Sequence, residues 1–372
     1  MKIGIPTEVK NHEYRVAATP EGVHELTAHG HRVFVQAGAG VGSAIADEGF
    51  MTAGAEVLPD ADAVFEQADL IVKVKEPQPE EFARFRSDQA VFTFLHLAAD
   101  EKLTRFLMER GIRALAYETV QTSDGRLPLL APMSEIAGRM APQEGAKYLE
   151  RPQGGRGVLM GGASGVMPAK VVVLGGGMAG WNAAEIAAGL QAEVVVVDRN
   201  VERLREIDRI WRGRIQTVMS SRLAIERLVL EADLVIGAVL VPGAKAPHLV
   251  TAEHVRAMRP GSVLVDVSID QGGCFATSRI TTHDDPTFVV DDVVHYCVGN
   301  MPGAVPRTST YALTNVTLPY VLAIADLGVE AAIAADPALA LGVNTWDGQV
   351  SMQGVAEAWG LTFTPLASLL TA

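Results

Sequence analysis

Three glycines at positions 175, 177 and 180 form the strongest chemical pattern in the sequence. They follow an apolar run, 171–174, and open an alanine-rich stretch with the spacing G-x-G-x-x-G. Between a buried strand and a helix this spacing predicts a dinucleotide site. Gly175 permits the tight turn, Gly177 lets the backbone approach a pyrophosphate, and Gly180 lets helix and strand pack closely. The helix N-terminus would add free N–H groups and a partial positive charge. A tight turn in a fold that binds another ligand is the alternative.

A carboxylate at the end of the next apolar run strengthens this prediction. Asp198 closes the segment EVVVVD, 18 residues after Gly180. A carboxylate in that position accepts hydrogen bonds from ribose hydroxyls and repels a 2′-phosphate, which favours NAD over NADP. Arg199 follows directly. It either softens this discrimination or is an ordinary solvated residue at a helix entry.

A second set of polar residues, Arg15, Lys75, His96 and Asp270, could carry proton and hydride chemistry. Taken singly, the first three have ordinary interpretations: a surface arginine, a lysine on an exposed strand edge and a core histidine. Asp270 differs, because it follows a strand and precedes two glycines that would hinge a loop. Together, two cations, a group that titrates near neutrality and a carboxylate suit a small carboxylate substrate.

Short β-branched runs alternate with helical patterns over the first third of the chain, which predicts a parallel α/β sheet. Glycines at 30 and 111 follow the helical patterns 21–28 and 100–110, where a left-handed C-terminal cap is expected. The strands are predicted at Lys2–Ile5, Arg32–Val35, Leu70–Lys75, Ala90–Leu95 and Arg113–Tyr117.

A second α/β series begins at residue 170. Its strands are predicted at Lys170–Leu174, Glu193–Asp198, Ile215–Met219, Leu234–Ala238, Ser262–Val267 and Phe288–Val290. Ligands bind beyond the carboxyl ends of such strands, which makes Ser220, Val239, Leu240 and the run Ser268–Asp270 cofactor-side candidates. Ser220 could equally be a helix N-cap.

Two further segments have helical patterns. In residues 133–149 we expect a bent or broken helix, because Pro142 and Gly145 lie inside the pattern. The tail from about residue 308 shows helical patterns at Tyr311–Leu327, Ala331–Leu341 and Gly354–Trp359. It has no predicted sheet of its own, so it should pack on the first half.

Composition excludes several classes of protein. The chain has 372 residues and a net charge of −13, from 31 Lys/Arg and 44 Asp/Glu. Such an acidic chain, without a basic run, is a poor partner for nucleic acid or an anionic membrane. Apolar stretches interrupted by charges predict no membrane span, and the N-terminus lacks a secretory pattern. Two cysteines without zinc-ligand spacing fit a reducing compartment, so a cytoplasmic protein is expected.

Eight segments, in the same order along the chain, resemble the alanine dehydrogenase/pyridine nucleotide transhydrogenase family, and within it the L-alanine dehydrogenases. A more distant likeness is to saccharopine and lysine-forming dehydrogenases. The eight segments are GIPTEVKNHEYRVAATP, KVKEP, FTFLHLA, APMSEIAGRMA, LGGGMAG, GAVLVPGAKAPHLV, VDVSIDQGGC and NMPGAVPRTSTYALTN.

The resemblance implies an α/β fold of two doubly wound Rossmann-like domains with the active-site cleft between them. Residues 1–128 and 308–372 would form a discontinuous substrate domain, and residues 129–307 an NAD-binding domain. A homohexamer is also implied. Ala323 and Leu327 provide no acid or histidine for a metal site known in some relatives, so no metal is expected.

The resemblance also assigns roles to single residues. Arg15 and Lys75 would hold the substrate carboxylate and carbonyl oxygen. His96 would be the acid/base, and Asp270 would act on water and the amine. Position 203 is one where the family can carry lysine. The residues expected to meet NAD are Ser134, Gly175, Gly177, Met178, Ala179, Gly180, Asp198, Arg203, Ser220, Val239, Leu240, Val267, Ser268, Ile269, Asp270, Arg279, Val298, Gly299, Asn300 and Met301.

The implied reaction is the reversible, NAD-dependent oxidative deamination of L-alanine to pyruvate and ammonia. NAD takes a hydride from the α-carbon, water adds to iminopyruvate, and the carbinolamine collapses. One alternative is a soluble NAD-binding subunit of a proton-translocating transhydrogenase, with a membrane partner and NADP(H). Another is a non-catalytic NAD-binding module, which the polar residues at strand ends argue against.

Overall fold

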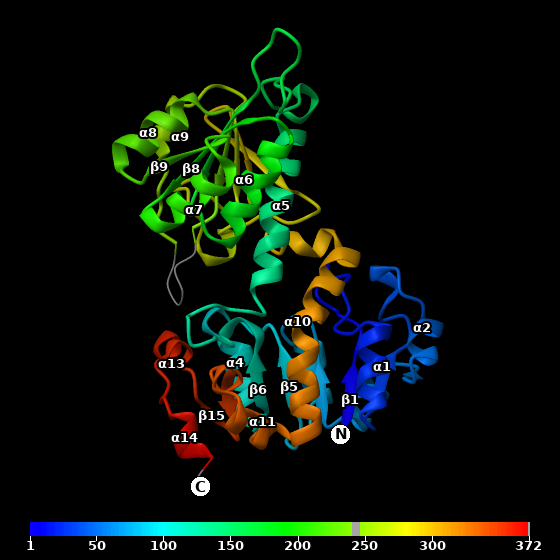
Figure 1. The fold of residues 1–372 in the computed structure, drawn as a ribbon. Helices are drawn as coiled ribbons and strands as arrows, with labels where there is room; N and C mark the ends of the chain where they lie inside the picture. The colour runs from blue at the N-terminus through cyan, green and yellow to red at the C-terminus, as the bar shows by residue number, and fades with distance from the viewer. Residues whose placement is uncertain (240–245, 371–372) are drawn as a thin grey trace. The chain divides into compact units, whose positions relative to one another are not determined.

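The computed structural model describes residues 1–239 and 246–370, and the chain divides into two compact units. Unit 1 is Met1–Met133 together with the chain from Gly303 onward, and unit 2 is Ser134–Pro302. Each unit is built on its own sheet (Figure 1). The predicted α/β class with two largely parallel sheets is therefore confirmed.

The sheet of unit 1 has the strand order β15-β14-β6-β5-β4-β1-β2-β3. From β3 to β6 all neighbours pair in parallel, in the doubly wound order 3-2-1-4-5-6. The chain order reverses between β1 and β4, and ligands bind at such a switch point. The parallel strands are β1 Lys2–Ile5, β2 Arg32–Gln36, β3 Glu56–Leu58, β4 Leu70–Val72, β5 Ala90–Thr93 and β6 Arg113–Ala116.

The C-terminal tail adds two strands to this sheet, which the helical patterns did not predict. β14 (Val343–Trp346) pairs antiparallel with β6, and β15 (Gln349–Val350) with β14. The tail thus returns to the first half, as expected, but by strand pairing as well as by helix packing. Strands this short carry too few residues for a periodic signal, and β3 was missed for the same reason.

The two glycines expected at helix C-termini of unit 1, Gly30 and Gly111, both have a left-handed φ. Thr19 caps α1 by accepting a hydrogen bond from the Gly22 N–H, and Gly111 ends α4 with a left-handed φ of 70°. α1 packs against α10 (Figure 1). The helices are α1 Pro20–Ala28, α2 Asp47–Thr52, α3 Ala61–Gln67, α4 Glu101–Arg110, α10 Pro306–Leu327, α11 Val329–Ala335, α12 Pro337–Ala340, α13 Gln353–Trp359 and α14 Leu366–Leu369.

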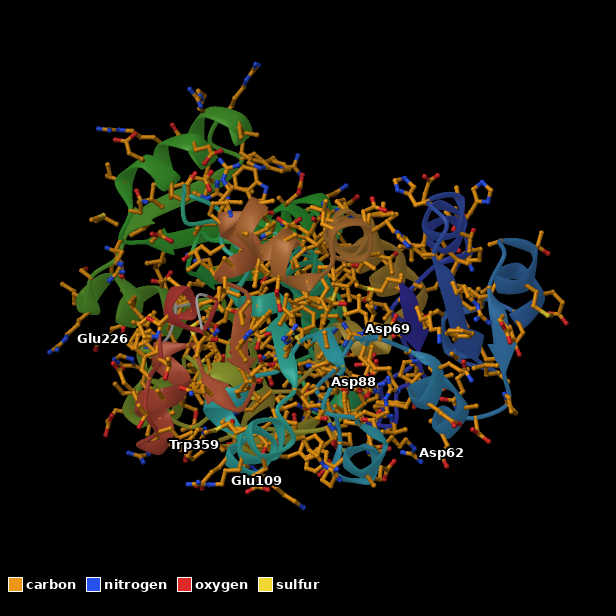
Figure 2. All side chains as sticks on the ribbon, turned by 90° about the horizontal axis from the view of Figure 1, so that it is seen from below. Asp62, Asp69, Asp88, Glu109, Glu226 and Trp359 are labelled. Atoms are coloured by element: carbon orange, nitrogen blue, oxygen red, sulfur yellow. The ribbon has the colours of Figure 1, made fainter. Side chains whose placement is uncertain are left out.

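The apolar face of α4 lies in a core that it shares with α13. Leu103, Phe106 and Leu107 are buried there, as their spacing predicts, together with Val355 of α13. Trp359, which Figure 2 labels near the end of α13, donates a hydrogen bond to the Leu97 carbonyl at 2.8 Å. The tail is therefore part of the core of unit 1.

The sheet of unit 2 has the order β12-β13-β11-β10-β7-β8-β9. When β7 is counted as the first strand, its first five strands again follow the order 3-2-1-4-5, and β13 pairs in parallel with β11 as the sixth parallel strand. Only β12 pairs antiparallel among its described strands. The strands are β7 Lys170–Leu174, β8 Glu193–Asp198, β9 Ile215–Met219, β10 Leu234–Gly237, β11 Val263–Asp266, β12 Thr287–Val290 and β13 Val293–Tyr296. The helices are α5 Ala131–Tyr148, α6 Met178–Gly189, α7 Val201–Trp211, α8 Arg222–Glu231 and α9 Ala252–Ala257.

Helix α5 runs without interruption through Pro142, so the expectation of a broken helix is wrong. Its glycines have a packing reason. A Cβ on Gly138 would lie 2.2 Å from the Ala179 carbonyl oxygen, and one on Gly145 would lie 2.4 Å from the Leu234 side chain. Close packing of α5 on unit 2 offsets the intrinsic cost of proline and glycine in the helix interior.

No helix within residues 1–239 and 246–370 is both long enough and apolar enough to cross a bilayer.

Candidate active site

The candidate residues of unit 1 follow the strands on either side of its switch point. Arg15 follows β1, Lys75 follows β4 and His96 follows β5. Because β1, β4 and β5 are parallel neighbours, their carboxyl ends share one edge of the sheet. The fold therefore brings together three residues that the sequence separates by up to 81 positions.

Arg15 is buried, with 2% of its surface exposed, so the surface interpretation is wrong. Its guanidinium donates to both carboxylate oxygens of Glu13, from Nε to Oε1 at 2.6 Å and from Nη2 to Oε2 at 2.5 Å. Nη1 lies 2.9 Å from the Met133 sulfur. This two-point contact holds the guanidinium plane in one orientation, which prepares it to recognise a carboxylate.

Lys75 is also buried, with 9% exposed, and it lies beyond the end of β4 rather than on an exposed edge. Its carbonyl accepts a hydrogen bond from the Thr93 hydroxyl at 2.9 Å. Burial alone would raise the pKa of the neighbouring Glu76, but the ammonium groups of Lys75 and Lys10 hold it below its ordinary value. Lys75 thus contributes positive charge to a largely buried environment.

His96 is not a core residue: 43% of its side chain is exposed. It has a left-handed φ of 51°, uncommon for a residue with a side chain. Its backbone N–H donates to Glu118 at 2.6 Å, and its ring lies parallel to Phe94 at a centroid distance of 5.9 Å. Backbone strain held by surrounding contacts is typical of a functional position.

In unit 2 the glycine turn has the predicted geometry. Gly175 has a φ of 99°, and a Cβ there would lie 2.7 Å from the Ala238 carbonyl oxygen. A Cβ on Gly180 would lie 1.7 Å from the Gly175 carbonyl oxygen, so only glycine permits this approach of helix to turn. At Gly177 a Cβ would meet no atom within 4 Å, and no side chain caps α6. The space and the N–H groups suit a pyrophosphate.

Asp198 at the end of β8 is held by the same turn. Its Oδ2 accepts from the Gly176 N–H at 2.6 Å, and its Oδ1 accepts from the Asn200 N–H at 2.7 Å. Arg203 donates from Nε to the Gly176 carbonyl at 2.6 Å and stacks 4.8 Å over the Trp181 ring. Arg199 is exposed.

Ser220, another cofactor candidate, lies between β9 and α8. Ser220 is not the N-cap of α8: Ser221 caps that helix by accepting from the Ala224 N–H, whereas the Ser220 N–H donates to the Asp198 carbonyl at 2.9 Å. Leu240 lies outside the described residues.

The loop after β11 carries Asp270, which is exposed and precedes two glycines with left-handed φ, as predicted. The Asn300 N–H lies 3.5 Å from an Asp270 carboxylate oxygen, so the runs Val267–Asp270 and Val298–Met301 lie side by side. Arg279 stacks 4.3 Å over the Phe288 ring.

Asp266 anchors this loop and was not predicted. It is fully buried and accepts from the Ser268 and Cys274 N–H groups at 3.1 and 2.8 Å and from the Ser278 hydroxyl at 2.6 Å. Burial raises its pKa. Its place in the apolar run VLVDV was the one available signal, since an unpaired carboxylate is costly there.

Buried charges in unit 1 were missed as well. Glu8, Lys73 and Glu81 lie behind Lys75, and the side chain of Glu13 orients Arg15. The charged runs TEVK and KVKEP contain two of these residues, Glu8 and Lys73, but such runs are equally typical of a solvated surface. Among the described residues, no three His, Cys, Asp or Glu side chains are arranged to hold a metal ion.

A largely parallel sheet whose first five strands follow the order 3-2-1-4-5, a glycine turn opening a helix and a strand-end carboxylate define unit 2 as a dinucleotide-binding α/β domain. Comparison with known proteins agrees. Residues 4–137 match the family model "Alanine dehydrogenase/PNT, N-terminal domain", and residues 141–353 match "Alanine dehydrogenase/PNT, C-terminal domain". The chain belongs to the alanine dehydrogenase/PNT family, which confirms the resemblance seen in its segments.

Individual relatives match over the whole chain. The alanine dehydrogenase of Mycolicibacterium smegmatis is 59% identical over 370 residues, which covers 100% of both chains. That of Bacillus subtilis is 53% identical over 100% of this chain and 98% of its own. A solved L-alanine dehydrogenase superposes with a TM-score of 0.94 at 50% identity, covering 97% of this chain and 99% of its own. A transhydrogenase from Sinorhizobium meliloti reaches a TM-score of 0.80 at 25% identity, covering 95% and 99%.

Family membership implies a nicotinamide cofactor and small-molecule substrates. The residues present fit such a cofactor, because Gly177 leaves open space beside the uncapped start of α6 and Asp198 lies at the end of β8.

Proposed function

We propose that this chain catalyses the reversible oxidative deamination of L-alanine to pyruvate and ammonia with NAD. One observation carries the proposal. The loops after β1, β4 and β5 bring Arg15, Lys75 and His96 to one sheet edge, in a chain whose full-length relatives are named alanine dehydrogenases. Unit 1 binds the substrate in this proposal, and unit 2 binds the cofactor.

The carboxylate and carbonyl oxygen of the substrate contact Arg15 and Lys75. Glu13 holds Nε and Nη2 of Arg15 and so fixes the plane of the guanidinium, whose positive charge would attract the substrate carboxylate. Lys75 places a positive charge beside the carbonyl oxygen, where negative charge develops when ammonia adds to the carbonyl carbon of pyruvate. The two contacts also fix the α-carbon in one position, which hydride transfer requires.

Proton transfer falls to His96 and Asp270. Imidazole takes up and releases protons near neutrality, and the exposed side chain of His96 can exchange them with solvent. Water adds to iminopyruvate at the carbon, and a proton must move to nitrogen before ammonia leaves. The carboxylate of Asp270 is the second group for these steps.

The cofactor, when bound, accepts the hydride from the α-carbon. Gly175 to Ala179 and the start of α6 would hold its pyrophosphate, and Asp198 its ribose hydroxyls. The carboxylate of Asp198 would repel a 2′-phosphate, which supports NAD rather than NADP. The other cofactor contacts are proposed at Ser134, Arg203, Ser220, Val239, Leu240, Arg279 and the runs Val267–Asp270 and Val298–Met301.

The test is spectrophotometric. The purified chain should oxidise NADH only when pyruvate and ammonia are both present, and should reduce NAD with L-alanine faster than with other L-amino acids. NADPH should be a much poorer donor. Absence of pyruvate amination would refute the proposal.

The transhydrogenase-like structural match makes a second function worth separating. A transhydrogenase subunit would bind NADH but need a partner chain, and it would not turn over alanine by itself. The same assay without any partner therefore decides between the two.

We also propose a homohexamer in the cytoplasm, which the family resemblance supports. Light scattering on the purified chain tests the assembly, and cell fractionation tests the compartment.

A further inference from the structure

Glu8, Lys73 and Glu81 form a buried charged triad that contacts the backbone on either side of Lys75. The Lys73 ammonium is 3.1 Å from Glu8 Oε2 and 2.9 Å from Glu81 Oε1, and the three side chains are 0%, 2% and 1% exposed. The triad places two carboxyl groups and one ammonium in the interior, where burial raises the pKa of Glu8 despite the nearby Lys73. Replacing such groups by apolar ones is often neutral or stabilising, so stability alone is a weak reason for the triad.

The two carboxylates also bind the backbone of the segment that contains Lys75. Glu8 accepts from the Val74 N–H at 2.6 Å, and its other oxygen lies 3.4 Å from the backbone nitrogen of Lys75. Glu81 accepts from the Gln78 N–H at 2.8 Å. Glu8 thus holds the beginning of the segment 73–78, and Glu81 holds its end.

Lys73 connects these two anchors. Each carboxylate uses one oxygen for the Lys73 ammonium and the other for a backbone N–H of the segment: the Val74 N–H for Glu8 and the Gln78 N–H for Glu81. The segment is therefore closed into a loop by its own first residue. The neighbouring strand β5 and the residue after it also hold the segment: the Lys73 N–H donates to the Phe92 carbonyl, and the Phe94 N–H donates to the Val74 carbonyl.

We propose that the Glu8–Lys73–Glu81 triad is a positioning device for Lys75, which fixes the loop so that the Lys75 ammonium meets the substrate's oxygen atoms. The proposal rests on the proposed function. Lys73 itself touches no substrate in this account and acts through the backbone of Lys75. Because a catalytic cation must be placed to within a fraction of an ångström, loosening the loop weakens substrate capture.

The first experiment replaces Lys73 by methionine, which keeps an unbranched chain and removes the charge. Two carboxylates are then left together without their shared cation, and the loop loses its connection. We expect the KM for pyruvate to rise at least ~10-fold, while the Kd for NADH, measured by fluorescence titration, stays within about twofold of wild type.

A triple variant provides the rescue. In Lys73→Met/Glu8→Gln/Glu81→Gln no charge remains, but each glutamine keeps an oxygen that can accept from the Val74 or Gln78 N–H. The KM for pyruvate should return to within about threefold of wild type. A triple variant as impaired as Lys73→Met would overturn the role of the backbone anchors.

Two surface variants are the matched controls. Lys102→Met removes an exposed lysine from α4, and Asp88→Asn an exposed carboxylate from unit 1 (Figure 2). Each of these variants should leave the KM for pyruvate and the Kd for NADH unchanged. If Lys73→Met lowers the thermal midpoint but leaves the KM for pyruvate unchanged, the triad is structural only and the proposal fails.

If Lys73→Met does not fold, Glu81→Gln replaces it, since it weakens only one ion pair. A rise of about threefold in the KM for pyruvate is then expected, and an unchanged KM overturns the proposal. Failure of the proposed function looks different, because the wild-type chain would then show no pyruvate amination at all.

Discussion

The two units share the strand order 3-2-1-4-5 around their switch points but position their chemical groups by different means. In unit 1 the groups at the switch point are charged side chains held by other charged side chains, such as Arg15 by Glu13 and Lys73 by Glu8. In unit 2 the corresponding groups are backbone. Asp198 accepts from two backbone N–H groups of the adjoining turn and helix entry, and glycines leave the space beside it.

The sheet edge that carries these groups is suited to a different ligand in each unit. Side-chain cations can grip a small carboxylate at two points and neutralise charge that develops on it. Backbone N–H groups and a helix N-terminus suit the phosphates that all dinucleotides share. Unit 1 should therefore be most sensitive to removal of side-chain atoms, and unit 2 to their addition.

The largest effect is expected in unit 1, from Lys75→Ala. Loss of this cation should lower kcat/KM for pyruvate amination by ~10²–10³-fold, because the developing negative charge loses its partner. The Kd for NADH should stay near that of wild type. Steady-state kinetics and fluorescence titration measure the two quantities.

The matched control is Lys102→Ala, which removes an exposed lysine from α4. It should behave as wild type. A Lys75→Ala variant with normal turnover would show that the substrate binds elsewhere.

The next effect concerns an added methyl group in unit 2. Gly180→Ala would place a Cβ 1.7 Å from the Gly175 carbonyl oxygen, so the turn or α6 must shift. We expect NADH binding to weaken at least ~10-fold, since the N–H groups of α6 no longer face the phosphates. Titration of NADH fluorescence measures this.

Gly189→Ala, in the same helix, is the control, because a Cβ there meets no atom within 4 Å. It should bind NADH as wild type does, and alanine's better helix propensity should keep it at least as stable. Equal effects from both variants would break the proposed link between the close approach at Gly180 and cofactor binding.

The smallest effect concerns the two buried anchors. Burial raises the pKa of both carboxyl groups, but Glu8 has Lys73 as counter-ion, whereas Asp266 is surrounded by neutral donors. A carboxyl group with a raised folded-state pKa contributes stability that is complete in acid and lost as pH rises through that pKa. Each tenfold change in proton affinity corresponds to about 1.4 kcal/mol.

The free energy of unfolding of wild type should therefore exceed that of Asp266→Asn by the largest amount near pH 4. This difference should become smaller as the pH rises toward neutrality. Urea unfolding at several pH values measures the difference. A gap that is constant with pH would mean that Asp266 titrates as it does in the unfolded chain.

Much of the fold was predictable from the sequence because it depends on local patterns. Most strands of both sheets and the glycine turn followed from apolar periodicity and spacing. β14 escaped prediction because four residues carry no periodic signal, and its partner β6 lies more than 200 positions away. α5 stayed whole through Pro142 because tertiary packing outweighed helix propensity.

The candidate site was less predictable residue by residue. Arg15 and Lys75 are of types that are usually exposed, and His96 ends an apolar strand, so each ordinary interpretation pointed the wrong way. They stood out only when they were considered as a set, and the family resemblance then assigned each of them a role. Glu8, Glu81 and Asp266 had no comparable signal, because a buried carboxylate is recognised by the donors around it and not by its neighbours in sequence.

Local patterns in the sequence predicted most of the elements and the cofactor turn, since strand periodicity, helix caps and the need for glycine at close approaches are local properties of the chain. Tertiary structure decided which charges are buried and which charged groups meet. Burial and ion pairing depend on residues distant in sequence: Lys73 meets Glu8 only because β1 and β4 are neighbours at the switch point. The ion pairs of unit 1 therefore form only in the folded chain, whereas the glycine turn of unit 2 can be recognised from the spacing of its residues in the sequence.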